Sequence, residues 1–291
     1  MLLALIWVAS GPTTNSQTGE RPATLALLDF GDSNIGRLAS EKIASNLRQG
    51  TSIVILDREQ IRAAARGAGY GGSINLSIDE ARDLGAALGC DFFILGDAQT
   101  LRRSPSTGPI YFESYASLFT VSARTGRLIH WERPSFQGAT AASAEQALLS
   151  ELAGFDQRRN IELSVRRAEE DERGERALTT DQQVPIIEEA PDDDKSAAAE
   201  GLRLPRPYRR LIPEYPESAA RAEAEATVDV LVDLDSSGEV TRVEIARWAG
   251  FGLDQTTVAT VRRLHFFPAM RNGVAIPIRV LLRYNFRKPT Q

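Results

Sequence analysis

The sequence of 291 residues has few of the side chains that build most catalytic and metal sites. Its one cysteine, Cys90, excludes an internal disulfide and a zinc site made of several cysteines. Its two histidines, His130 and His265, each stand beside an aromatic residue in or next to an expected strand, so we interpret both as packing or surface residues. We therefore expect no catalytic residue, no cofactor and no metal, and a protein that is not an enzyme.

Long apolar runs are also missing. The longest uninterrupted apolar stretch is the start, MLLALIWVAS, which is shorter than the about 20 residues that cross a bilayer. Its length and its small residues fit a signal peptide within residues 1–22, although no Lys or Arg precedes the run. We expect an exported protein of the periplasm or envelope. A start site placed too far downstream and an apolar tail on a cytosolic protein are the alternatives.

Positive charge is not concentrated along the chain. The formal net charge is -5 and the isoelectric point is near 5.3, and the arginines are dispersed, so a nucleic-acid partner is not predicted. Residues 154–204 are more acidic than basic, whereas residues 205–291 are more basic than acidic. This shift indicates a domain boundary.

Residues 23–153 alternate between strand and helix patterns. ATLALLDF and CDFFILGDAQTL are continuous apolar runs typical of buried strands, and NIGRLASEKIASNLRQG carries an apolar stripe at helical spacing. IYFESYASLFTVSA and RLIHWERPSF predict an antiparallel hairpin joined at RTG. Together these segments predict an α/β domain with a mixed sheet.

The ordered segments TLALLDFGD, SIVILDREQI, ARDLGAALGCDFFILGDAQ and ARTGRLIHWE resemble the periplasmic α/β domain shared by the TolB N-terminal region, the curli secretion protein CsgG and the LpoB-type activators. The resemblance covers residues 23–153. It implies assembly or docking at the outer membrane without chemistry. CsgG and LpoB are lipoproteins, and this chain has no lipid-accepting cysteine after its apolar start.

Residues 154–204 differ from both flanks. Arg158, Glu162, Arg166 and Glu170 follow one another at four-residue spacing, which favours a charged helix. The acidic stretch after them has little apolar surface, so we interpret it as a solvated linker.

Residues 205–291 show the order strand, strand, helix, strand. EATVDVLVDLDSSGEVTRVEIARW alternates around the turn DSSG, LDQTTVATVRRL is a short amphipathic helix, and IPIRVLLRYNF is the last strand. Tyr215 and Pro216 match the YP entry motif of the TonB family C-terminal domain. GLDQTTVATVRRLHFFPAMRNGVAIPIRVLLRYNF matches that domain's closing signature, with Leu264 where the family often has Trp. Residues 211–286 thus resemble this domain, which implies capture of a segment of an outer-membrane receptor by strand addition.

The last strand is the candidate binding site. Pro277 near its start cannot donate a ladder hydrogen bond and argues for a sheet edge. Arg279, Leu281 and Arg283 share its outer face. A solvated edge protected by charge is the alternative to strand addition. With Tyr215 and Pro216, these residues are the predicted partner-binding set.

Three further patterns favour ordinary structural roles. Asp233 to Glu244 matches the spacing of a calcium loop, but both flanks alternate as strands, so a hairpin turn is favoured. GAGYGG follows an expected helix and is interpreted as a loop. Asp29 and Asp57 end strands and are interpreted as turn and helix-capping residues.

The fold class predicted for the chain is α+β, with two domains: an N-terminal α/β domain and a C-terminal TonB-like β-β-α-β domain, joined by a charged helix and linker. The predicted function is that of a TonB-family energy transducer supporting transmembrane transport, with an envelope protein such as a TonB-dependent receptor as partner. A scaffold without energy coupling is the alternative. A second copy of the chain paired through the edge is a further predicted partner, and no small-molecule substrate is expected.

Overall fold

The computed structural model describes residues 21–179, 187–191 and 194–288, so the signal-like segment expected at residues 1–22 lies almost wholly outside the described residues. In the N-terminal domain six strands form one sheet of order β2-β1-β3-β4-β5, with β6 also paired to β4. β1 runs parallel to β2 and β3, and the remaining pairs are antiparallel, which confirms the mixed sheet. The strands are β1 Thr24–Leu27, β2 Val54–Ile55, β3 Phe92–Arg103, β4 Tyr111–Ser122, β5 Leu128–Glu132 and β6 Ser135–Gly138.

The helices of this domain begin where the sequence supplies capping side chains. Asp57 accepts hydrogen bonds from the backbone of Glu59 and Gln60, as its expected capping role requires, and Ser77 with Glu80 forms a capping box. Asp29 differs from the expectation. It receives Arg58 Nη2 at 2.6 Å and Arg62 Nε at 2.7 Å instead of capping a helix. The helices are α1 Asn34–Arg48, α2 Arg58–Gly67, α3 Ile78–Leu88, α4 Ala141–Leu152 and α5 Phe155–Thr179.

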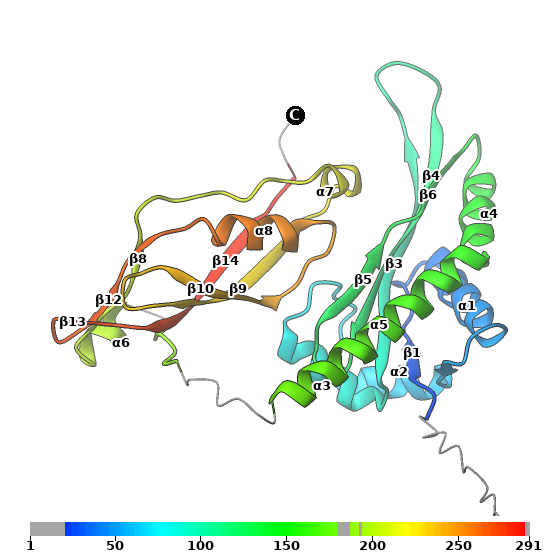
Figure 1. Ribbon diagram of the computed structural model, residues 1–291. Helices are drawn as coiled ribbons and strands as arrows, with labels where there is room; N and C mark the ends of the chain where they lie inside the picture. Colours follow the sequence, from blue (N-terminus) through cyan, green and yellow to red (C-terminus); the bar gives the residue numbers. More distant parts are fainter. Residues whose placement is uncertain (1–20, 180–186, 192–193, 289–291) are drawn as a thin grey trace, which may run out of the picture.

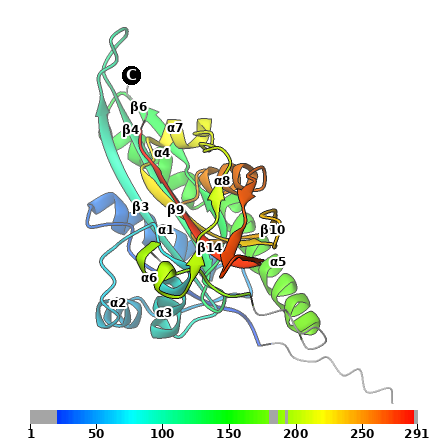
Figure 2. The same ribbon diagram turned by 90° about the vertical axis from the view of Figure 1, so that its left-hand side faces the viewer.

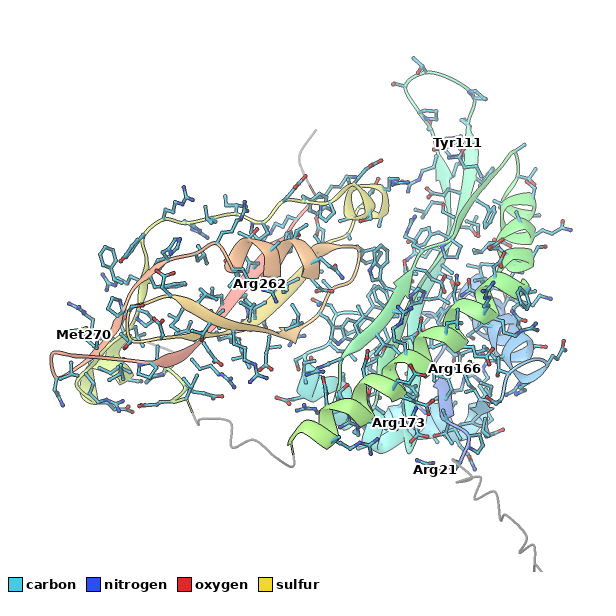
Figure 3. The ribbon with its side chains drawn as sticks, in the orientation of Figure 1. Arg21, Tyr111, Arg166, Arg173, Arg262 and Met270 are labelled. Atoms are coloured by element: carbon cyan, nitrogen blue, oxygen red, sulfur yellow. The ribbon has the colours of Figure 1, made fainter. Side chains whose placement is uncertain are left out.

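Helices cover the N-terminal sheet on both faces (Figure 1). On one face α1, α4 and α5 bury apolar side chains against it, including Ile43, Leu148 and Val165. On the other face lie α2 and α3 together with part of the C-terminal domain. β3 and β4 continue beyond this body as a long hairpin, and Tyr111 at the start of β4 lies near its projecting end (Figure 3). The sheet is therefore a buried layer with little free apolar surface.

The C-terminal domain is built around a second sheet of order β10-β9-β14, with β9 in the middle and α8 across one face (Figure 1). Its apolar face carries Val228, Val230 and Val232 from β9, all fully buried. Figure 2 shows the same three strands from the side. The sheet and its helix span β9 Ala226–Leu234, β10 Val240–Arg247, α8 Leu253–Val261 and β14 Ile278–Phe286.

Short elements that the sequence patterns did not reveal surround this unit. β8 pairs with β11, and β12 pairs with both β7 and β13. The short elements are α6 Asp194–Ala199, β7 Leu202–Arg203, β8 Arg206–Pro207, α7 Glu217–Ala222, β11 Phe266–Phe267, β12 Ala269–Arg271 and β13 Val274–Ile276.

The calcium-like sequence pattern forms the β9–β10 hairpin turn. Asp235 Oδ1 accepts hydrogen bonds from the backbone of Ser237 at 2.8 Å and of Glu239 at 3.0 Å. Glu244, the last position of the pattern, lies in strand β10. The pattern therefore serves the turn.

The two domains share one apolar core. Trp248 is buried, and its Nε1–H donates to the carbonyl of Gly126 at 3.0 Å. Its ring stacks on Phe119 of β4, with the ring centroids 5.9 Å apart. The ring centroid of Phe251 lies 5.4 Å from that of Phe119 and 5.3 Å from that of Trp131. The C-terminal domain is thus packed directly on the N-terminal sheet.

Polar contacts fix the orientation at this junction. The Asn75 side chain accepts from the backbone N–H of Thr227 at 3.0 Å and donates to the carbonyl of Trp248 at 2.6 Å. Arg247 Nη1 reaches Glu80 at 3.0 Å. Gly250 has a φ of +73°, and a Cβ there would come within 2.6 Å of the Phe119 ring, so both the backbone and the contact require glycine.

No helix in the described parts of the chain is both long enough and apolar enough to cross a bilayer.

Candidate strand-docking edge

β14 forms one edge of the C-terminal sheet, as Pro277 predicted. It pairs with β9 in an unbroken antiparallel register from Ile278 opposite Leu234 to Phe286 opposite Ala226. Backbone groups of a strand alternate between its two sides. The N–H and C=O of Arg279 point away from β9, so those of Leu281, Arg283 and Asn285 do so as well. The outward backbone groups of Leu281, Arg283 and Asn285 form a hydrogen-bonding edge that is open to another strand.

The two faces of β14 differ as the alternation predicts. Ile278 and Phe286 are buried, and the residues between them on the same face are half-buried. Leu281, Arg283 and Asn285 are exposed on the opposite face, and Leu281 keeps 49% of its surface accessible. An apolar side chain held in water at a sheet edge is a contact that an added strand can cover.

The arginines of the candidate set are held by β9. Arg279 lies opposite Asp233 and donates to it through Nε at 2.5 Å and Nη2 at 2.8 Å. Arg283 lies opposite Asp229 and donates through Nε at 2.8 Å and Nη2 at 3.0 Å. Both are bidentate carboxylate pairs, the strong form of this interaction. The hydrogen bonds that Arg279 donates to Asp233 raise the pKa of the Arg279 guanidinium, which stays fully charged.

The third strand completes this charged face. Arg247 of β10 approaches Asp229 at 3.4 Å, so that carboxylate lies between two guanidinium groups. Asp229 and Asp233 keep only 4% and 3% of their surface. The arginine side chains therefore cover buried carboxylates as well as presenting charge, and a role of Arg279 and Arg283 in direct partner binding stays a prediction.

Tyr215 and Pro216 lie at the other end of β14 from Arg279. The Tyr215 ring centroid is 6.4 Å from that of Phe286, and its hydroxyl donates to the carbonyl of Ala224 at 2.8 Å. Pro216 is the residue before α7. The structure thus separates these two residues from Leu281 and places them where they hold the end of the strand.

The sequence analysis missed a segment at this edge. The backbone N–H of Arg279 donates to the carbonyl of Glu188 at 2.8 Å, and the N–H of Ala190 donates to the carbonyl of Arg279 at 2.8 Å. Residues 187–191 fall in the stretch interpreted as a solvated linker. An apolar alternation would have signalled a strand, but this segment pairs through backbone groups, with two acidic side chains and the partly buried Ala190 beside them, so composition gave no sign of it.

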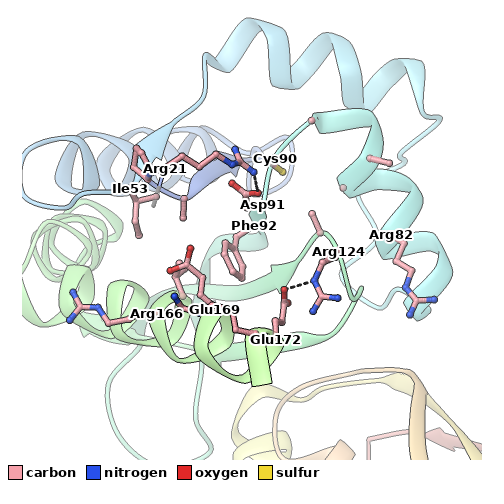
Figure 4. Close-up of a pocket in the computed structure, with 18 of the residues that line it drawn as sticks. Arg21, Ile53, Arg82, Cys90, Asp91, Phe92, Arg124, Arg166, Glu169 and Glu172 are labelled. Carbon is pink, nitrogen blue, oxygen red and sulfur yellow. Dashed lines mark hydrogen bonds and ion pairs between the residues drawn. The ribbon is translucent and has the colours of Figure 1, made fainter. Parts of the chain in front are cut away.

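A cavity with a volume of about 940 Å³ lies in the N-terminal domain (Figure 4). Its charged side chains pair with one another: Arg21 with Asp91 and Arg124 with Glu172, each at 2.6 Å. Burial raises the pKa of the Cys90 thiol there to about 12, which keeps it protonated.

His130 and His265 lie far apart in the sequence and in different domains. His265 Nδ1 lies 2.8 Å from Glu239 on the surface, and His130 lies on β5. No group of three or more His, Cys, Asp or Glu side chains within the described ranges is arranged to hold a metal ion.

Residues 212–287 match the sequence model of the Gram-negative bacterial TonB protein C-terminal family. The match does not reach the N-terminal domain, so the resemblance of residues 23–153 to the TolB, CsgG and LpoB group stays a prediction. The search of curated proteins gave no match.

Three solved structures show partial similarity to the chain. The Pseudomonas aeruginosa TonB C-terminal domain is 19% identical, with a TM-score of 0.26, and the alignment covers 30% of this chain and 89% of that one. The hypothetical protein CT253 of Chlamydia trachomatis is 13% identical, with a TM-score of 0.33 and coverage of 45% and 93%. The lipoprotein GNA1162 of Neisseria meningitidis is 12% identical, with a TM-score of 0.32 and coverage of 45% and 99%.

The family match spans the strands β9, β10 and β14, helix α8 and the Tyr215–Pro216 entry motif, in the order that the sequence predicted. By this sequence match, residues 212–287 of this chain resemble a TonB C-terminal domain.

Proposed function

We propose that the chain is an envelope protein of the energy-transducer type that captures an extended segment of a partner, such as a TonB-dependent outer-membrane receptor, by strand addition at β14. Capture of this kind supports transmembrane transport by linking the receptor to the chain. The observation that carries the proposal is the outward backbone row of Leu281, Arg283 and Asn285, which lies in a domain of the TonB C-terminal family. Backbone bonds supply affinity, and alternate side chains supply selectivity.

The character of this edge supports the proposal. β14 is long, with nine residues in continuous register with β9, and unprotected long edges invite further pairing. Its arginines are tied to Asp229 and Asp233, so their guanidinium groups lie over the sheet face and leave the outward backbone groups uncovered. Among the described residues, no strand pairs with this edge beyond Arg279.

A proline at Leu281 tests strand addition. Leu281 turns its N–H outward, so Leu281→Pro removes a donor for the incoming strand and leaves the bonds to β9 in place. A photo-crosslinker at the exposed Asn285, used in the native envelope, then reports what the edge captures. We expect Leu281→Pro to lower the yield of captured partner at least about tenfold, since a lost ladder bond also stops the pairing from extending.

Leu281→Ala is the matched control. It keeps the N–H and removes most of the apolar side chain, so we expect a smaller loss. Recovery of an outer-membrane receptor from the unmodified chain supports the transducer role. Equal yields from Leu281→Pro and the unmodified chain would overturn strand addition at this edge.

A scaffold without energy coupling is the second candidate function. The observation that favours it is the shared core, in which Trp248 and Phe251 pack on Phe119 and join the two domains. A unit of this kind suits assembly at the envelope, where both domains contact partners together. In the crosslinking experiment, this role predicts capture of an envelope protein that is not a TonB-dependent receptor, and self-pairing predicts capture of a second copy of the chain.

A further inference from the structure

The edge of β14 already has an occupant at its first position. Glu188 and Ala190 bond to the two outward groups of Arg279, at 2.8 Å each, in the pattern of a parallel ladder centred on Glu189. These residues belong to the connection between α5 and α6, not to the sheet itself. The chain thus adds a short strand of its own where a partner strand would begin or end.

The side chains of this segment complement the edge. The Glu188 carboxylate pairs with Arg271 of β12 through two hydrogen bonds, one of them 2.8 Å between Oε2 and Nη1. The charge of Glu189 contributes to raising the pKa of Arg279. Two successive carboxylates therefore face two arginines of the C-terminal domain. The acidic composition of residues 187–191 has a specific counterpart on the surface it contacts.

The contact is short and open to solvent. It consists of one residue of pairing, and the carbonyl of Ala190 does not accept a hydrogen bond from the next outward N–H, that of Leu281. The Glu188 and Arg271 side chains keep 42% and 34% of their surface, and exposed ion pairs are weak and screened by salt. A segment held in this way can leave the edge readily.

We propose that residues 188–190 are an internal competitor for the docking edge: they occupy the outward groups of Arg279, and a partner strand that pairs along the whole of β14 must displace them. The proposal rests on the proposed function, because it concerns the same edge. An N–H donates to one strong acceptor at a time, so the internal segment and a full-length partner strand exclude each other at Arg279. Binding of the partner is then reduced by the fraction of molecules in which the segment is in place.

The competition is confined to one end of β14. The segment covers only the Arg279 end and leaves Leu281, Arg283 and Asn285 open. A partner can therefore first pair with the open positions and then replace residues 188–190 at the covered one. A partner segment with a carboxylate at the position of Glu188 gains the contact with Arg271 that the internal segment gives up. The edge thus favours an extended acidic segment.

Ala190→Pro tests the occupancy in the full-length chain. It removes the N–H that donates to Arg279, and the described residues 187–191 belong to no helix, so we expect the fold to be retained. Ala190→Ser keeps the N–H and is the matched control. Amide hydrogen exchange measured by NMR reads the result at Arg279, whose N–H faces the segment, and at Val280, whose N–H faces β9.

We expect exchange at Arg279 to become about tenfold faster in Ala190→Pro, and unchanged exchange at Val280 and in Ala190→Ser. Glu188→Lys, which places a cation against Arg271, should have the same effect at low salt and a weaker one at high salt. Equal exchange rates at Arg279 in the unmodified chain, in Ala190→Pro and in Glu188→Lys would show that residues 188–190 do not occupy the edge.

Crosslinking from Asn285 tests the competition. Release of the segment should raise the yield of captured partner about threefold or more in Ala190→Pro relative to Ala190→Ser. Faster exchange at Arg279 with an unchanged yield, while Leu281→Pro still abolishes capture, would overturn the competition and leave strand addition standing. If Leu281→Pro has no effect on capture, the proposed function fails, and the exchange at Arg279 still decides whether the segment occupies the edge.

Discussion

The two largest folded layers of this protein, the N-terminal sheet and the β10-β9-β14 sheet, contain similar strands in opposite surroundings. The N-terminal sheet has helices on one face and helices with the C-terminal domain on the other, and its apolar residues lie in two cores. The C-terminal sheet has one apolar face, one face of paired Asp and Arg side chains, and an edge strand whose outward groups are mostly open. A sheet covered on both faces has only its edges left for binding, and in the C-terminal sheet that edge is the long strand β14. The difference supports the proposal that the C-terminal domain binds a partner strand.

Trp248→Ala should break the contact between the two sheets and has the largest expected effect. The substitution removes a fully buried indole that packs on Phe119 and donates to Gly126, so we expect the free energy of unfolding to fall by about 4 kcal/mol. Urea unfolding followed by circular dichroism measures it. Trp248→Phe keeps most of the ring packing and loses the hydrogen bond, so it should cost about 1 to 2 kcal/mol. Equal losses in the two variants would show that the ring packing contributes little.

The turn at the junction should make stability depend on pH. Burial raises the pKa of Asp254 from 3.8 to about 6, although its carboxylate accepts the N–H groups of Ala249 and Gly250, both at 2.8 Å. The folded protein then holds a proton that the unfolded chain releases, so stability falls as pH rises from about 4 to about 6. At 1.36 kcal/mol per pKa unit, the change is at most about 3 kcal/mol.

Asp254→Asn should flatten this part of the stability profile, because the amide does not titrate. Urea titrations at several pH values between 4 and 7 compare the two slopes. A variant with the same slope as the unmodified chain would show that other groups cause it.

Asp233→Ala tests the charged face of the C-terminal sheet. It leaves the Arg279 guanidinium without its bidentate partner over a buried site, and we expect a loss of about 2 kcal/mol, less than for a fully buried pair because Arg279 keeps 22% of its surface. The double variant Asp233→Thr with Arg279→Thr replaces the pair by one that suits opposed strand positions and should recover most of the loss. If the double variant is as unstable as Asp233→Ala, the unpaired charge is not the cause.

Leu281→Ala should have the smallest effect on stability. The side chain is half exposed at an edge, so the free energy of unfolding should change by less than about 0.5 kcal/mol. Combined with reduced partner capture, this result would mark Leu281 as a binding residue with little structural role. A large loss of stability would instead make the edge part of the core and weaken its contrast with the N-terminal sheet.

Much of the fold was predictable because its strands are long and regularly patterned. The apolar runs ending at Asp29 and Asp57, the hairpin around Arg124 to Gly126 and the final alternating strand all appear where the sequence placed them. α4 was missed, since its residues are mostly small and show a weak apolar stripe. β7, β8 and β11 to β13 were missed because strands of two or three residues depend on tertiary partners more than on local preference.

The candidate site was predictable in part. The outer face of β14 and its place at an edge follow from alternation and from Pro277. The sequence did not predict that Asp229 and Asp233 bind its arginines. These aspartates have the same four-residue spacing as Arg279 and Arg283 and lie opposite them in antiparallel register. Only the register between distant strands decides which residues of two such sets meet.

The sequence by itself determined the two domains, the TonB-like order of the second one and the face of the last strand that meets water, because these properties follow from local periodicity and motif spacing. The tertiary structure alone decided that Trp248 joins the domains, that Asp229 and Asp233 hold the arginines, and that residues 188–190 lie on the edge of β14. Each of these depends on groups brought together from distant positions in the chain, and backbone hydrogen bonds such as those of Arg279 leave no trace in residue type.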